Sequence, residues 1–227
     1  KLNHPRIVFT RVAPFNDSAT NEYATLRVLD DGMGGAGIHL TNWEIWDMDG
    51  SGGEVLNDVL IQTGNLIRLH YYSNGSVAEE TSAGADGIIE RYVNAGIAGL
   101  GSADGLILRT AYRLDGCTNY MDAVVWGSNG ATSGGELADL EDMTNAGEWN
   151  NTTILDYARL TPDFGYFARR SNASGVPLDS NSASDWTNIL TAYYVNDGAV
   201  SAGALTFAAG SATTGNGTRM KPFASVG

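Results

Sequence analysis

A stretch of twelve residues carries oxygen side chains at the spacing of a calcium-binding loop. These side chains stand at positions 1, 3, 5 and 12: Asp47, Asp49, Ser51 and Asp58. Calcium prefers several hard oxygen ligands that converge on one point, and Gly52 at position 6 would permit the sharp turn of an EF-hand loop. The stretch departs from that pattern because position 8 is Glu54, where an apolar residue is usual, and position 12 is not glutamate. Two interpretations stay open, a calcium site and a polar β-turn.

Other motifs lack the context that their chemistry needs. The run 32–37 has the G-x-G-x-x-G spacing of a dinucleotide-binding turn, but the residues after it predict extended chain where a helix must follow. The run 49–53 resembles a serine protease nucleophile loop only in passing. Three histidines lie far apart, with no metal-ligand spacing: His4, His39 and His70. We therefore expect a glycine-rich hairpin loop at 32–37 and neither a zinc site nor a catalytic triad.

The charge of the chain limits its partners. It has 26 acidic and 13 basic residues, a net charge of -13, and only two lysines, Lys1 and Lys221. Such a surface repels nucleic acid phosphates and anionic lipids, attracts divalent cations and suits saline surroundings. No run approaches the roughly 18 apolar residues of a membrane-spanning helix. A further acidic group is read as a solvated face: Glu136, Asp139, Glu141 and Asp142.

Export to the cell surface is the expected localisation. Cys117 is the only cysteine, so an intramolecular disulfide is impossible and packing must hold the fold. Six Asn-x-Ser/Thr sequons are candidate glycan acceptors: Asn16, Asn74, Asn150, Asn151, Asn172 and Asn216.

Short strands dominate the predicted secondary structure. Six segments are rich in β-branched or aromatic residues and bounded by Gly, Asn and Asp: Arg6–Val12, Glu22–Leu29, Trp43–Asp47, Leu66–Tyr72, Gly105–Ala111 and Met121–Trp126. In Leu66–Tyr72 the alternation places Ile67, Leu69 and Tyr71 on one face, which can be buried. The one expected helix is Asp86–Asn94, with Asp86 as its cap. This spacing predicts an all-β antiparallel sandwich or barrel.

Six blocks of the chain resemble, in order, the strand motifs of lamin-tail domains. They are Arg6–Pro14, Asn21–Leu26, Ile38–Trp43, Asp104–Arg109, Met121–Gly127 and Ser184–Trp186. The resemblance implies an immunoglobulin-like β-sandwich, used in nuclear lamins as a tail on filament-forming chains and in prokaryotes on secreted or surface proteins. It implies no catalytic residues.

The resemblance divides the chain into two parts. Residues 1–190 form the lamin-tail-like sandwich, with insertions near 71–100 and 128–163, and residues 191–227 form a C-terminal extension rich in Ala, Gly, Ser and Thr. Three tryptophans sit at strand ends or in apolar runs and are expected to anchor the core: Trp43, Trp126 and Trp186.

The C-terminal extension contains a strand pattern at 199–209. Leu205 and Phe207 share one face and Val200 lies on the other, so the segment could add to an exposed sheet edge of its own sandwich or of a neighbouring copy. We expect a non-enzymatic extracellular protein that builds a filament or surface layer from copies of itself. The alternatives are a calcium-dependent adhesion module of a larger secreted protein and a hydrolase built from dispersed carboxylates.

Overall fold

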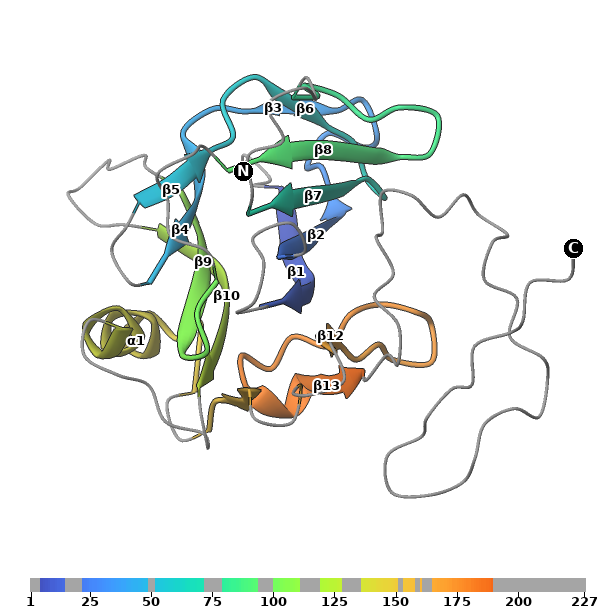
Figure 1. The fold of residues 1–227 in the computed structure, drawn as a ribbon. Coiled ribbons are helices and arrows are strands. Elements are labelled where there is room, and N and C mark those ends of the chain that lie inside the picture. The colour runs from blue at the N-terminus through green and yellow to red at the C-terminus, as the bar shows by residue number, and fades with distance from the viewer. Residues whose placement is uncertain are drawn as a thin grey trace, which may run out of the picture.

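The computed structural model of the chain describes residues 5–14, 22–48, 52–71, 79–93, 100–110, 119–127, 136–150, 153–157, 160 and 165–189. These residues are mostly strands, arranged in two large open sheets and one small one (Figure 1). The expected all-β class is therefore confirmed.

The first sheet has six strands in the order β13-β12-β1-β2-β7-β8. Its strands are β1 (Arg6–Ala13), β2 (Tyr23–Asp30), β7 (Leu66–His70), β8 (Ile88–Tyr92), β12 (Tyr166–Arg169) and β13 (Trp186–Ile189). Neighbours are antiparallel except β7 and β8, which are parallel.

The second sheet has five strands in the order β11-β10-β9-β4-β5. Its strands are β4 (Trp43–Asp47), β5 (Gly52–Val55), β9 (Asp104–Thr110), β10 (Asn119–Gly127) and β11 (Leu155–Asp156). Only β10 and β11 are parallel. A two-stranded sheet pairs β3 (Ile38–Leu40) with β6 (Val59–Ile61), and the helical elements with described bounds are α1 (Glu136–Ala146) and the short 3-10 helix η2 (Ala183–Asp185).

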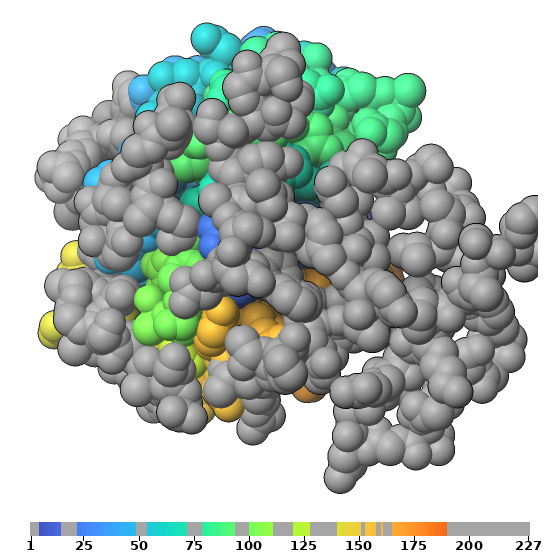
Figure 2. Space-filling model, in the orientation of Figure 1, coloured from blue at the N-terminus to red at the C-terminus, as the bar shows by residue number. Residues whose placement is uncertain are grey.

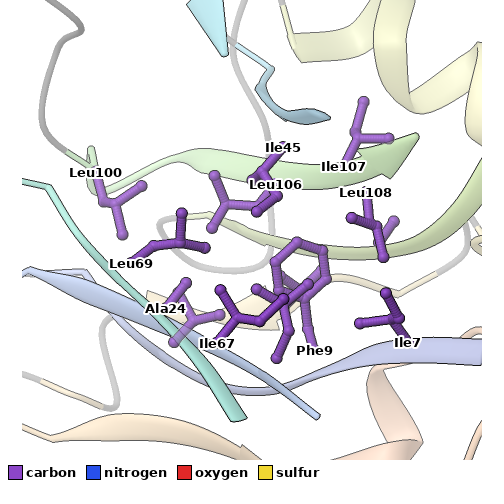
Figure 3. Packing of buried hydrophobic residues seen from close by; sticks show 14 of the residues in the cluster. Ile7, Phe9, Ala24, Ile45, Ile67, Leu69, Leu100, Leu106, Ile107 and Leu108 are labelled. Atoms are coloured by element: carbon purple, nitrogen blue, oxygen red, sulfur yellow. The ribbon is translucent and has the colours of Figure 1, made fainter. Parts of the chain in front are cut away.

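One hydrophobic core lies between the two large sheets. Ile67 and Leu69 of β7 face Leu106 and Leu108 of β9 across it, as Figure 3 shows. Alternate residues of a strand point to opposite faces, and the predicted inward face of Leu66–Tyr72 is confirmed because Ile67, Leu69 and Tyr71 are all buried. The described part of the chain therefore has a sandwich-like architecture.

The tryptophans predicted to anchor this core are buried. Trp43, Trp126 and Trp186 are 6%, 0% and 3% exposed and belong to the main cluster. In space-filling form, the cyan to teal segments lie at the top of the view and the yellow and orange segments below them (Figure 2).

The predicted helix at Asp86–Asn94 is wrong, because this segment contains β8. Ile89, Arg91 and Val93 are buried at alternate positions, which is the period of a strand. Asp86 accepts a hydrogen bond from the backbone N–H of Ile88 at 3.1 Å, so the residue read as a helix cap closes a turn before β8. Helix caps and Asx turns use the same side-chain contact.

The two predicted insertions contain regular structure. The first, 71–100, supplies β8 at one edge of the six-stranded sheet, and the second, 128–163, supplies α1 and β11. Helix α1 lies against β10 and was not predicted. It buries Leu140 and Met143 and exposes Glu141 and Asp142, so these two acids do lie on a solvated face.

Candidate functional site

The structure separates two of the predicted calcium ligands. Asp47 is buried at the end of β4 opposite Gly52, whereas Asp58 is exposed in the turn beyond β5 with a φ of 66°. The extended stretch between them, from Gly52 to Leu56, spans about 13 Å at roughly 3.3 Å per residue. Two oxygens on one calcium ion lie within about 5 Å of each other, because each sits at roughly 2.3–2.6 Å from the ion. Asp47 and Asp58 therefore do not form one EF-hand type site.

Metal ligands are not gathered elsewhere in the described residues. They contain no group of three or more His, Cys, Asp or Glu side chains that could hold an ion. Asp49 and Ser51 lie outside them, as do His4 and Cys117. His39 is exposed in β3. His70 is buried, with its Nε2 atom 2.8 Å from Oε2 of Glu90 and its ring stacked on that of Tyr92. His70 thus belongs to a network on the outer face of the six-stranded sheet.

The glycine-rich run 32–37 forms a loop around a carboxylate of the chain itself. Asp31 accepts hydrogen bonds from the backbone N–H groups of Met33, Gly35 and Gly37 at 2.9–3.0 Å. These donors, that of Gly35 above all, lower the pKa of Asp31 to about 2. Successive N–H groups of this kind form an anion-binding nest. Because Asp31 fills the nest and β3 follows it, a phosphate-binding turn is excluded here. The run is a glycine-rich loop as predicted, but the predicted hairpin is wrong, because β2 and β3 belong to different sheets and do not pair.

A buried ion pair connects the two large sheets. Asp122 of β10 accepts hydrogen bonds from Arg169 of β12 at 2.7 Å and from the backbone N–H of Phe9 in β1 at 2.6 Å. The Asp122 and Arg169 side chains are each 1% exposed. Burial raises the pKa of Asp122 to about 6, against the opposing effect of Arg169. We call this pair the Asp122–Arg169 clasp.

Two β-bulges position the clasp. The register between β1 and β2 shifts between Phe9 and Arg11, and that between β10 and β9 shifts between Tyr120 and Asp122. Bulges redirect side chains and interrupt a ladder. Here they bring a carboxylate of one sheet against a backbone donor of the other, while Arg169 also stacks on Trp186 at 4.9 Å.

A second ion pair joins the sheets at their other side. Arg91 of β8 contacts Glu54 of β5 at 2.7 Å and Glu79 at 3.0 Å. Burial raises the pKa of Glu54, and the hydrogen bond and charge of Arg91 oppose that rise. The contact holds the edge strands β8 and β5 of the two sheets together.

Further carboxylates surround Tyr71 at one end of the sandwich. Burial, followed by the charges of Asp47, Asp104, Glu54 and Glu22, raises the pKa of Tyr71 far above its usual value. Burial also raises the pKa of Glu22 to about 7, although Glu22 accepts a hydrogen bond from the N–H of Leu100 at 2.9 Å.

The carboxylate of Asp104 is bonded to backbone as well. It accepts hydrogen bonds from the N–H groups of Gly101 and Gly105 at 3.0 and 2.7 Å. Together Glu22 and Asp104 fix the chain that enters β9.

Strand β13 leaves a sheet edge open within the described residues. The N–H of Arg170 donates to the carbonyl of Asp185 at 2.6 Å. Hydrogen-bonded pairs alternate along an antiparallel ladder. The backbone N–H and C=O groups of Thr187 and Ile189 therefore also point toward β12, and those of Trp186 and Asn188 point away from it. The outward N–H of Trp186 bonds to the Ala183 carbonyl. Asn188 therefore offers the remaining outward donor.

Strand β5 leaves a longer edge open at the other sheet. The N–H of Leu56 donates to the carbonyl of Trp43 at 2.8 Å, and Glu54 lies opposite Ile45. By the same alternation, the backbone N–H and C=O groups of Gly53 and Val55 point away from β4. No strand of the described residues pairs with this edge. Val55 is also one of few large apolar side chains that are exposed here, at 43%.

Several predicted residues cannot be placed against these edges. The assembly residues Val200, Leu205 and Phe207 lie outside the described residues. Of the sequons, Asn150 and Asn172 are exposed, which a glycan acceptor requires, and the other four lie outside the described residues: Asn16, Asn74, Asn151 and Asn216. Among the helices that the structure describes, none has the length and apolar character needed to cross a bilayer.

Comparison with known proteins does not assign the chain to a family. No protein-family model matches the sequence, and no curated protein matches it either. The resemblance to lamin-tail domains stays a prediction that rests on the six sequence blocks.

Sequence reasoning missed the clasp residues. Asp122 lies within a predicted strand, where a charged residue is normally read as solvent-facing, and Arg169 lies outside the six predicted strands. One signal was present, because Asp122 follows Met121 and precedes the apolar run Ala123–Trp126. A single charge at the border of a fully apolar strand indicates a buried, paired group.

Proposed function

We propose that this chain is a non-catalytic, extracellular structural protein that assembles with copies of itself into a filament or surface layer. The C-terminal extension, residues 191–227, pairs with a neighbouring copy. The observation that carries this proposal is the position of β13. It is the last described strand, it lies at an edge of the six-stranded sheet, and the chain continues beyond it for residues 190–227.

The composition of the extension supports pairing between copies. From Gly198 to Thr218 it contains no charged residue, and Leu205 and Phe207 share one face of the predicted strand. Small residues allow close approach of two backbones, and strand addition gains ladder hydrogen bonds together with apolar anchors. Exchange from one copy to the next gives an open polymer when the rotation does not close.

The charged interior supports a structural role for the folded part. Asp122, Arg169, Glu54 and Arg91 hold one sheet to the other, and the carboxylates of Glu22 and Asp104 bond to backbone N–H groups. In this reading the buried ionisable groups stabilise the fold and perform no chemistry.

An immunoglobulin-like, lamin-tail-like fold of a prokaryotic surface protein is part of the proposal. Two largely antiparallel sheets over one core, with buried Trp43, Trp126 and Trp186, support it. The parallel pairs β7–β8 and β10–β11 are departures from a purely antiparallel sandwich.

A chain that ends at Asp197 tests the proposal. It retains every described strand, so we expect a folded monomer, whereas the full chain forms polymers as concentration rises. Light scattering coupled to size exclusion and electron microscopy measure assembly, and circular dichroism measures folding.

The matched control is Met33→Ser in the full chain. Met33 is 55% exposed on the glycine-rich loop, which is part of neither open edge, so this variant should assemble as the unaltered chain does. Continued assembly of the truncated chain, or a monomeric full-length chain, would refute the proposal.

A further inference from the structure

The two large sheets have four edges, and two of them are poor acceptors for a further strand. At β8 the outer carbonyls already accept hydrogen bonds, from Glu80 N–H to Glu90 at 3.0 Å and from Gly84 N–H to Ile88 at 3.3 Å. Strand β11 has only two residues. The candidates that remain in the described part of the chain are β13 and β5.

Strand β5 offers more backbone groups than β13. Gly53 and Val55 both point an N–H and a C=O away from β4, whereas Asn188 supplies the one outward N–H that remains on β13. The chain also continues directly from β13 into its own extension. Strand β5 is therefore the better acceptor for a segment that comes from another molecule.

The outer face beside this edge carries an apolar site. Val55 is 43% exposed, and its neighbour across the ladder is Glu44. Trp46 lies opposite Gly53, which has no side chain. The guanidinium of Arg109 stacks on the Trp46 ring at 3.9 Å from its centroid. The half-buried indole of Trp46 thus has no side chain beside it on β5. An aromatic residue on an adjacent strand commonly fills the space next to an edge glycine.

The extension has side chains at the matching interval. Gly53 and Val55 are two residues apart and share a face, as do Leu205 and Phe207 in the predicted strand 199–209. Paired in a ladder, one apolar side chain would lie beside Val55 and the other beside Trp46. Cross-strand apolar and aromatic pairs of this kind stabilise sheets.

The charge of the C-terminal extension also favours its binding at the edge of β5. The extension from Gly198 onward contains Arg219 and Lys221 and no acid, so all 26 acidic residues lie on the rest of the chain. Near β5, Glu79 has a side chain that is 39% exposed. An uncharged strand with a basic end can approach this acidic surface without repulsion.

We propose that the outer edge of β5 binds the C-terminal segment 199–209 of a second copy of this chain. Leu205 and Phe207 then lie against Val55 and Trp46, in a ladder with Gly53 and Val55. This inference rests on the proposed self-assembly and specifies its acceptor site.

The test compares Val55→Pro and Val55→Ile in the full chain. The Val55 N–H makes no bond to β4, so proline removes the donor offered to the second copy and breaks no hydrogen bond between the residues that the structure describes. We expect Val55→Pro to raise the concentration needed for assembly at least about tenfold. Val55→Ile keeps the donor and the apolar side chain and should assemble normally. Thermal unfolding by circular dichroism checks that both variants fold.

Hydrogen–deuterium exchange of the unaltered chain tests the same contact without a substitution. The amides of Gly53 and Val55 should become protected above the assembly concentration and exchange freely in dilute monomer. This measurement decides the matter if Val55→Pro does not fold.

Each remaining outcome counts against one proposal or both. If Val55→Pro assembles normally, or if Gly53 and Val55 stay unprotected in the polymer, β5 is not the acceptor. Loss of assembly in Phe207→Asp would then keep the proposed function and place the segment on another edge. A full chain that stays monomeric at all concentrations overturns the acceptor site and the proposed function together.

Discussion

At the residue scale, buried charges in this protein act as connections between sheets. Asp122 bonds to Arg169 and to the N–H of Phe9, so three strands meet at one carboxylate. Taking such a pair out of water opposes folding, and the pair stabilises the fold only while all its hydrogen bonds are made. The consequence is that the cost of losing one partner greatly exceeds the net contribution of the pair.

Asp122→Ala should therefore lower the free energy of unfolding by about 3–5 kcal/mol, because Arg169 is left buried without its main partner. The Phe9 N–H would lose its acceptor as well. Urea denaturation at pH 7.5, above the pKa of Asp122, measures the change.

Asp179→Ala is the matched control for this substitution. Asp179 also contacts Arg169, at 3.4 Å, but its side chain is 27% exposed. Removal of such a partly solvated pair should change stability by about 1 kcal/mol or less. Equal effects of the two substitutions would show that the clasp is no more important than a surface contact.

At the element scale, the glycine-rich loop depends on backbone shape more than on contacts of side chains. Gly34 and Gly37 both have positive φ, 66° and 86°. A Cβ at Gly34 would meet nothing within 4 Å, whereas one at Gly37 would lie 3.0 Å from the Ile61 carbonyl and 3.1 Å from Cγ of Gln62. The loop between β2 and β3 therefore packs closely against β6 at one of these glycines only.

Gly34→Ala should destabilise the fold by about 1 kcal/mol, the cost of a side chain in the left-handed region. Gly37→Ala should cost about 1–3 kcal/mol more, because steric overlap with β6 is added. Thermal unfolding of the two variants gives the comparison. Similar melting temperatures would mean that β6 can move away from the loop without loss.

The sequence predicts those strands that are rich in β-branched or aromatic residues and bounded by Gly, Asn and Asp. Trp43–Asp47 was predicted with the observed bounds, and β1, β2, β7, β9 and β10 within a few residues. The helix predicted at Asp86–Asn94 is wrong because Asp86 closes a turn with the same side-chain contact that a helix cap would make. Strands β12 and β13 have four residues each, too few for a period to be recognised.

The candidate site was harder to predict than the fold. The calcium motif is defined by intervals along the sequence, and these do not fix distances in space. In the structure the β4–β5 hairpin places Asp47 and Asp58 at its opposite ends. An open edge is a property of strand order, and strand order brings together segments that are far apart in the sequence. Val55 is exposed at an edge because β5 follows β4 at the end of the five-stranded sheet.

At the scale of the whole molecule, charge opposes the association that the open edges favour. Each copy carries a net charge of -13, and its basic end is limited to Arg219 and Lys221 after the uncharged segment. The proposed contact consists of backbone hydrogen bonds and apolar side chains, which salt does not screen. The electrostatic repulsion between acidic copies, in contrast, acts over the screening length, which shortens as the salt concentration rises.

Assembly should therefore strengthen as sodium chloride rises. The screening length falls from about 30 Å at 0.01 M to about 3 Å at 1 M, so repulsion between acidic copies weakens while the strand contact persists. Static light scattering at fixed protein concentration should show growing polymers over this range. The variant Arg219→Gln, Lys221→Gln is more acidic and should need more salt, yet still assemble at 1 M. Polymers that dissolve as salt rises would show instead that ion pairs between the basic end and the acidic surface hold the copies together, and that the ladder on β5 contributes little.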